Sequence, residues 1–156
     1  DPFTIMYDSW KLHQRNLVPM TPEQARAAAA EIDAKVLSNR KPPYSLAGGL
    51  FDAMEDATGE IFKIGNNELS FWKEEFRSLE GIDIHNAAAV AVASLAEASR
   101  SGKIRPEETI MLNITGGGEE LAKSEGEITY AELDLVLDPS LPAGTIAEQV
   151  ERLFMN

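Results

Sequence analysis

The sequence TIMLNITGGG at residues 109–118 decides the fold that we expect for this chain. Residues 109–114 form an almost unbroken apolar run between a turn at residues 106–108 and three glycines, a pattern typical of a strand buried on both faces. Where this strand ends, the Thr115 hydroxyl is followed by glycines that let the backbone approach a ligand closely. In open α/β sheets, ligands bind beyond the carboxyl ends of the strands. The alternative interpretation is an ordinary strand-to-helix turn.

Helices are predicted on both sides of this run. Thr21 begins one, with Pro22 in the first turn and Gln24 in the capping-box position, and its apolar face continues to about Leu37. Further helices are predicted over residues 49–59, 66–79, 87–98 and 146–154, and strands over residues 60–64, 82–84 and 126–138. The order of these elements predicts one α/β segment over residues 1–156, with a mostly parallel sheet flanked by helices. Residues 126–156 are predicted to form a strand-plus-helix extension of it.

Composition narrows the classes of protein. A chain of 156 residues with 44% hydrophobic residues is long enough for one domain with a core. The absence of cysteine excludes disulfides and thiolate nucleophiles. A net charge of -12 repels phosphate backbones, so we expect no nucleic-acid partner. We also expect a cytoplasmic protein without a membrane partner, because no apolar run approaches the ~20 residues that span a bilayer.

The histidines and the most basic loop are candidates for binding a metal ion or an anionic ligand. His13 and His85 lie far apart in sequence without the spacing of metal ligands, so no metal site is predicted. The loop at residues 38–45 is the most basic point of an acidic chain. Its cationic side chains, Arg40 and Lys41, are expected either to bind an anionic ligand or to lie in solvent at a helix C-terminus, where they complement the helix dipole. The abrupt apolar start at residues 1–10 is interpreted as the cut edge of a longer protein.

Several stretches together resemble the C-terminal part of fold type II enzymes that use pyridoxal 5′-phosphate, the group of tryptophan synthase β and threonine synthase. They are EGIDI at residues 80–84, the alanine-rich run that follows, SGKI at 101–104 and MLNITGGG at 111–118. Within this group, LSNRKPPYS at residues 37–45 and GGL at 48–50 are similar to the cysteate synthase family, which makes L-cysteate from O-phospho-L-serine and sulfite on a route to coenzyme M. The resemblance runs from about Pro2 to about Asp138 and corresponds to the last third of such an enzyme.

The resemblance implies roles for particular residues. Thr115, with Gly116 beside it, would bind the pyridine nitrogen of the cofactor, and Glu80 and Gly81 would lie near the cofactor ring. The amino-acid substrate would lie near the loop that holds Asn39, Arg40 and Ser45. The Schiff-base lysine of the family falls outside the matching segment, so no catalytic residue is predicted here. For Glu80, a plain surface carboxylate at a helix end is the alternative.

Three hypotheses for function follow. The first is the C-terminal portion of a cysteate synthase-like transferase, inactive alone, whose partner is the missing N-terminal portion or a second copy of the chain. The second is a binding or regulatory module that keeps the fold without the chemistry. The third is another replacement or elimination activity on the same scaffold, such as that of threonine synthase.

Overall fold

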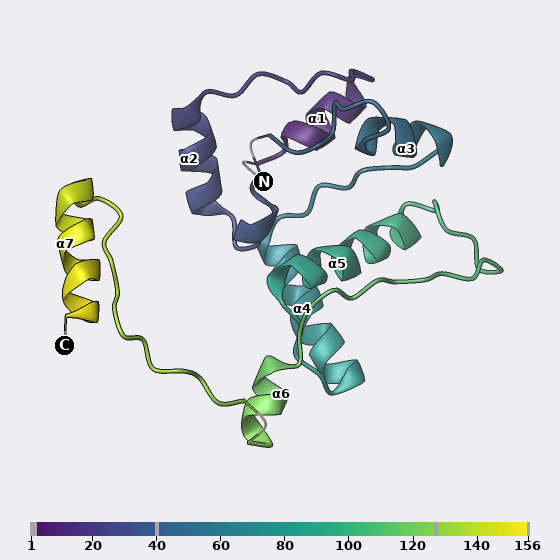
Figure 1. Cartoon of the computed structure of the whole chain (residues 1–156). Helices are drawn as coiled ribbons and strands as arrows, with labels where there is room; N and C mark the ends of the chain where they lie inside the picture. The colour runs from purple at the N-terminus through teal and green to yellow at the C-terminus, as the bar shows by residue number, and fades with distance from the viewer. Residues whose placement is uncertain (1–2, 40, 127, 156) are drawn as a thin grey trace.

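Helices account for about half of the described residues, and α4 and α5 form the closely packed pair at the centre of Figure 1. The computed structural model describes residues 3–39, 41–126 and 128–155. Helices α1 and α3 lie on one side of the pair, and α6 follows on the other side (Figure 1). The elements are α1 (Ile5–Lys11), α2 (Pro22–Glu31), the short 3-10 helix η1 (Lys35–Leu37), α3 (Leu50–Asp56), α4 (Asn66–Glu80), α5 (Asn86–Arg100), α6 (Glu119–Ser124) and α7 (Ala143–Phe154).

The predicted α/β fold with a mostly parallel sheet is wrong, because the part of the chain that the structure describes is all-α and contains no sheet. A strand is stable when neighbouring strands take up its backbone N–H and C=O groups. The apolar run at residues 109–114 is not helical, but no described segment pairs with it as a neighbouring strand. Met111 is 91% exposed, so the run is not buried on both faces. The sequence therefore has the pattern of a strand, while the partners of that strand are absent from the described chain.

The core lies between α4 and α5, which confirms the two helices predicted over residues 66–79 and 87–98. The alanines of α5 permit this contact because their small side chains let two helix backbones approach closely. Leu69 of α4 is buried in the core, and Trp72 and Phe76 pack against it. The buried members of the cluster are Ala34, Ile64, Leu69, Ile84, Ala88, Ala89 and Ala93.

Helix α2 begins as predicted and ends earlier. Thr21 and Gln24 form the capping box, with the Gln24 N–H donating to Thr21 Oγ1 over 3.2 Å and the Thr21 N–H donating to the Gln24 side chain over 2.9 Å. At the other end, the Asn66 side chain donates to the Glu31 carbonyl over 2.7 Å and accepts from the Asp33 N–H over 3.1 Å. Ile32 is extended and buried. A side chain of α4 thus ends α2, which no pattern within α2 indicates.

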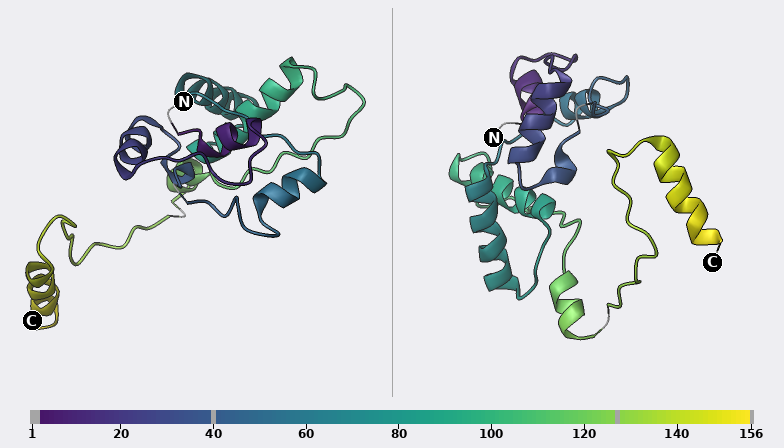
Figure 2. Two further views of the ribbon diagram at one scale, coloured as in Figure 1. Left: turned by 90° about the horizontal axis from the view of Figure 1, so that it is seen from above. Right: turned by 90° about the vertical axis from the view of Figure 1, so that its left-hand side faces the viewer.

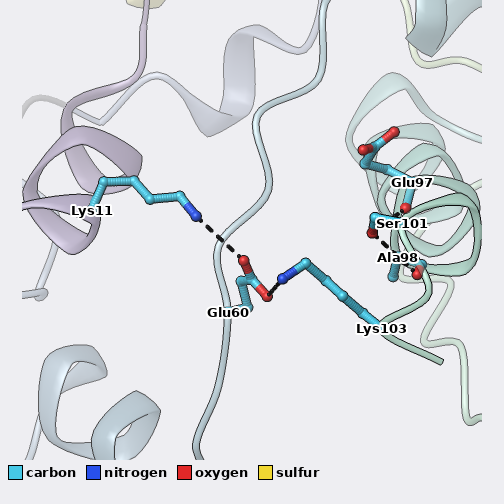
Figure 3. Close-up of polar contacts among 6 residues, drawn as sticks. All are labelled: Lys11, Glu60, Glu97, Ala98, Ser101 and Lys103. Carbon is cyan, nitrogen blue, oxygen red and sulfur yellow. Dashed lines mark hydrogen bonds and ion pairs between the residues drawn. The ribbon is translucent and has the colours of Figure 1, made fainter.

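An acidic side chain connects the N-terminal helices to the core. Glu60 accepts from Lys11 of α1 over 3.3 Å and, with its other oxygen, from Lys103 beyond the end of α5 (Figure 3). The hydrogen bond from Lys103 is the main reason why the pKa of Glu60 lies below its usual value. Beside this contact, the Ser101 hydroxyl donates to the Glu97 carbonyl over 2.7 Å at the end of α5. Glu60 therefore links Lys11 of α1 to Lys103 in the segment that follows α5.

Residues 128–142 connect α6 to α7, and α7 stands apart from the other helices in all three views (Figures 1 and 2). The structure confirms the predicted last helix, but none of its residues is buried. The predicted strand over residues 126–138 is not seen among the described residues. Within the described ranges, no helix combines the length and the apolarity needed to cross a membrane.

Candidate functional site

The chain after Ile114 turns tightly against residues 83–85. The His85 N–H donates to the Gly116 carbonyl over 3.0 Å, and the Gly118 N–H donates to the Asp83 carbonyl over 2.7 Å. Gly117 has a φ of +153°, and a Cβ there would lie 2.3 Å from the Asp83 carbonyl oxygen. A side chain at this position would therefore overlap the neighbouring backbone. Glycine is required at residue 117 because two stretches of backbone meet there.

A cavity of about 500 Å³ opens beside this turn, and Thr115 and Gly116 form part of its wall. Lys73 of α4 and Asn86 of α5 form another part, joined by a hydrogen bond of 2.9 Å from the lysine to the Asn86 amide oxygen. Asn86 in turn donates to the Asp33 carbonyl over 3.1 Å. The remaining wall comes from η1 and from the first residues of α5. The cavity has the size of a small-molecule site, and its wall combines hydroxyl, amide and cationic groups.

The structure brings together two of the residues predicted to contact a ligand, Thr115 and Gly116, but it does not add Glu80 or Gly81 to the same cavity. Glu80 is the exposed last residue of α4, and Gly81 ends that helix with a φ of +71°. These four assignments stay predictions.

The predicted substrate loop lies elsewhere. Asn39 accepts from the Lys41 N–H over 3.0 Å and lines a different cavity, together with residues of α1. Ser45 is half-buried next to Tyr44 and is not part of the wall beside Thr115. Arg40 lies outside the described residues. The roles of Asn39, Arg40 and Ser45 in substrate binding stay predictions.

Sequence reasoning did not assign a ligand-binding role to His85, which lines the Thr115 cavity. Its spacing from His13 only argues against a role as a metal ligand. Its position immediately before the alanine-rich helix was the available signal, because it identifies His85 as the N-cap of α5. The imidazole lies between Gly116 and Glu119, with Nε2 at 3.7 Å from a Glu119 oxygen.

Glu119 is held by two further side chains. It accepts a hydrogen bond from the Tyr130 hydroxyl, and the Lys123 ammonium lies 3.0 Å from one of its oxygens. The hydrogen bond with Tyr130 and then the one with Lys123 lower the pKa of Glu119 to about 2. The pKa of Lys123 is raised by its own contacts with Tyr130 and then with Glu119. The Glu119 carboxylate is therefore negatively charged throughout the physiological pH range.

Asp83 caps α6 from outside the helix. Its two carboxylate oxygens accept from the N–H groups of Glu120 and Leu121 over 3.2 and 3.3 Å, while the N-cap residue Gly118 has no side chain to do so. Burial raises the pKa of Asp83, but these hydrogen bonds outweigh that effect and the pKa lies below its ordinary value of 3.8. A carboxylate of lowered pKa stabilises the folded state above the unfolded-state pKa, and this contribution is lost as the pH falls through the folded-state pKa.

Replacing Asp83 by alanine is expected to speed amide hydrogen exchange in α6 and to leave the α4–α5 core protected, since only α6 loses its cap. Acidification of the unsubstituted chain below the lowered pKa should reproduce the loss of α6 structure. NMR-detected exchange measures the first effect and residue-resolved chemical shifts the second. Asp138→Ala is the matched control, because Asp138 also has a lowered pKa but bonds only to Ser140, away from α6. Equal exchange rates in α6 of both variants would contradict the capping role.

By sequence comparison, the chain is related to enzymes of the synthase class. Within that class the chain is homologous to cysteate synthases. It is 40% identical to the cysteate synthase of Methanosarcina mazei over 145 residues, which are 88% of this chain and 35% of the relative. Identity to the enzyme of Methanosarcina acetivorans is 39% over 143 residues, 90% of this chain and 34% of the relative. The Methanocella paludicola enzyme is 36% identical over 152 residues, 96% of this chain and 35% of the relative.

The chain spans about a third of the length of the curated relatives that it matches. No family model matches it. No solved structure matches it.

Proposed function

We propose that this chain is the C-terminal portion of a cysteate synthase-like enzyme and forms the side of the active site that faces the cofactor ring. The complete enzyme would use pyridoxal 5′-phosphate to replace the phosphate of O-phospho-L-serine by sulfite, giving L-cysteate. The observation that carries the proposal is that Thr115 and Gly116, in a segment homologous to cysteate synthases, line a cavity large enough for a small molecule.

The residues around this cavity fit the cofactor. A neutral hydroxyl at Thr115 is suited to a hydrogen bond with a ring nitrogen, and it does not require that nitrogen to be protonated. Lys73 adds a positive charge to the wall, which also contains Asp33, while the Lys35 ammonium donates to the carbonyls of Ala29 and Ala30 at the end of α2. When bound, pyridoxal phosphate supplies an electron sink for bond breaking next to the substrate amino group. The proposed role of this chain is to bind and orient the cofactor ring through Thr115. The wall formed by η1, α4 and α5 would limit the access of water.

The rest of the enzyme is the proposed partner. The apolar run at residues 109–114 carries the pattern of a buried strand, yet Met111 is almost fully exposed and Leu133 in the later extended segment is also exposed. Unpaired extended segments with apolar side chains are suited to pairing with another strand. We propose that the N-terminal portion of the enzyme covers these residues and supplies the Schiff-base lysine, with a second copy of the chain as the other candidate partner.

The proposal is tested by a chimera in which this chain replaces the matching third of the Methanosarcina mazei enzyme. We expect the chimera to bind pyridoxal phosphate and to form L-cysteate from O-phospho-L-serine and sulfite. Thr115→Val is expected to weaken cofactor binding about fivefold, because one neutral hydrogen bond is worth about 1 kcal/mol, and Thr115→Ser to preserve it. Cofactor absorbance measures binding, and product formation measures activity.

Thr109→Val is the matched control, since Thr109 begins the same apolar run and lies outside the cavity wall. A folded chimera that binds no cofactor would support the non-catalytic module instead. Threonine formation from O-phosphohomoserine without any use of sulfite would favour the threonine synthase-like alternative.

A further inference from the structure

His85 lies between the Thr115 turn and a charged carboxylate, and it contacts the turn in two ways. Its backbone N–H donates to the Gly116 carbonyl over 3.0 Å. Its ring covers Gly116, since a Cβ built on that residue would lie 2.8 Å from Nδ1 of the imidazole. Because Gly116 has no side chain, there is room beside it for the imidazole ring of His85. The residue next to Thr115 is thus held by both the backbone and the side chain of His85.

Glu119 approaches the opposite edge of the imidazole. Its carboxylate oxygen is 3.7 Å from Nε2, which is longer than a hydrogen bond and is the distance of an electrostatic contact. Glu119 is itself held by Tyr130 and Lys123 and stays ionised. An ionised carboxylate can only accept hydrogen bonds, so the favoured neutral tautomer of His85 carries its proton on Nε2. Nδ1, beside Gly116, is then left as a hydrogen-bond acceptor.

Thr115 itself is exposed, and the turn that presents it has glycine at the three positions that follow. Glycine allows many backbone conformations, so a turn rich in glycine holds a side chain in one place only when neighbouring groups restrain it. The restraints on this turn come from residues 83–85, and the imidazole is the side chain among them that covers Gly116.

We propose that His85 is a positioning residue for Thr115, and that Glu119 sets the orientation and tautomer of the His85 ring. The inference rests on the proposed function, in which the Thr115 hydroxyl meets the ring nitrogen of the cofactor. His85 acts through the turn: its ring and its N–H fix Gly116, and this fixes the direction of the hydroxyl one residue earlier. Glu119, Lys123 and Tyr130 form the support behind the ring.

The first test uses the chain alone and needs no cofactor. Long-range ¹H–¹⁵N NMR at about pH 8.5, where imidazoles are neutral, is expected to show His85 with the proton on Nε2. Glu119→Gln should move His85 toward a mixture of tautomers. The matched control is the exposed pair of His13 and Glu55, whose closest atoms are 3.6 Å apart: Glu55→Gln should leave the His85 signals unchanged. A proton on Nδ1 of His85, or no response to Glu119→Gln, would overturn the role of Glu119.

The second test uses the chimera and a double-mutant cycle between residues 85 and 115. His85→Ala is expected to weaken cofactor binding about as much as Thr115→Val, roughly fivefold, and the double variant should be no weaker than either single variant. His85→Asn should stay within about twofold of the unsubstituted chimera, because its amide places a polar atom near the position of Nδ1. Unfolding transitions that are unchanged in all four variants would show that the fold is intact.

The outcomes separate the two proposals. If the effects of His85→Ala and Thr115→Val on cofactor affinity multiply, His85 does not act through Thr115 and the inference is wrong, while the proposed function stands. If the unsubstituted chimera binds no cofactor, the proposed function fails and the positioning role fails with it. The tautomer measured in the chain alone still decides whether Glu119 orients His85.

Discussion

Replacing Ile84 by alanine is expected to lower the free energy of unfolding by about 2–5 kcal/mol, the usual range for truncating a buried isoleucine. Ile84 is 1% exposed and belongs to the cluster in which α4 and α5 meet. It also forms the isolated antiparallel bridge to Gly117. Because domains of this size are stable by only about 5–15 kcal/mol, the loss is a large share of the total. Urea unfolding followed by circular dichroism measures it.

Ile82→Ala is the matched control, two residues earlier in the same connection between α4 and α5. Ile82 is 39% exposed, so we expect its truncation to cost less than about 1 kcal/mol. Similar losses for the two variants would mean that Ile84 does not contribute to the core in the way that its burial indicates.

Replacing Gly117 by alanine is expected to cost about 2–6 kcal/mol and to separate the Thr115 turn from residues 83–85. The new Cβ would lie 2.3 Å from the Asp83 carbonyl oxygen and 2.6 Å from the Ile84 Cα, both backbone atoms that cannot move independently. Overpacking typically costs about 1–3 kcal/mol, and a side chain in a glycine-favoured backbone region adds about 1–3 kcal/mol. Urea unfolding measures the loss, and the chemical shifts of Thr115 and Gly116 report the movement of the turn.

Gly118→Ala separates the two causes of that loss. Gly118 also has a positive φ, +78°, but an added Cβ would meet no atom within 4 Å. We therefore expect about 1–2 kcal/mol from the backbone conformation alone and little change at Thr115. Should Gly118→Ala be as damaging as Gly117→Ala, close approach of the two backbones would not be the reason for glycine at residue 117.

The sequence predicted the helices with strong periodic patterns, and the structure confirms them. Thr21 and Gln24 mark the start of α2, and the alanine-rich run is α5. The end of α2 was missed because Asn66, from another helix, provides the partner that terminates it. Local patterns describe what a segment does with its own side chains and cannot indicate a cap donated from α4.

The position of part of the candidate cavity wall follows from the sequence, while the ligand-binding roles of its residues stay predictions. Thr115 and Gly116 were proposed from the apolar run before them, and they line a cavity together. Lys73 and His85 contribute to that wall from α4 and from the start of α5, and no spacing in the sequence connects them to Thr115. Their proximity depends on how α4 and α5 pack. Glu119 reaches His85 only because the glycine turn reverses the chain.

The sequence alone determined which segments are apolar, where helices begin, and which relatives the chain resembles, because these properties depend on residue types and their spacing. It also indicated a strand at residues 109–114 that needs neighbours on both sides. Only the tertiary structure decided whether such neighbours are present. In the described residues they are not, and the run forms no sheet. The physical reason is that a helix satisfies its backbone hydrogen bonds within one segment, whereas a strand depends on another segment that its own sequence does not specify.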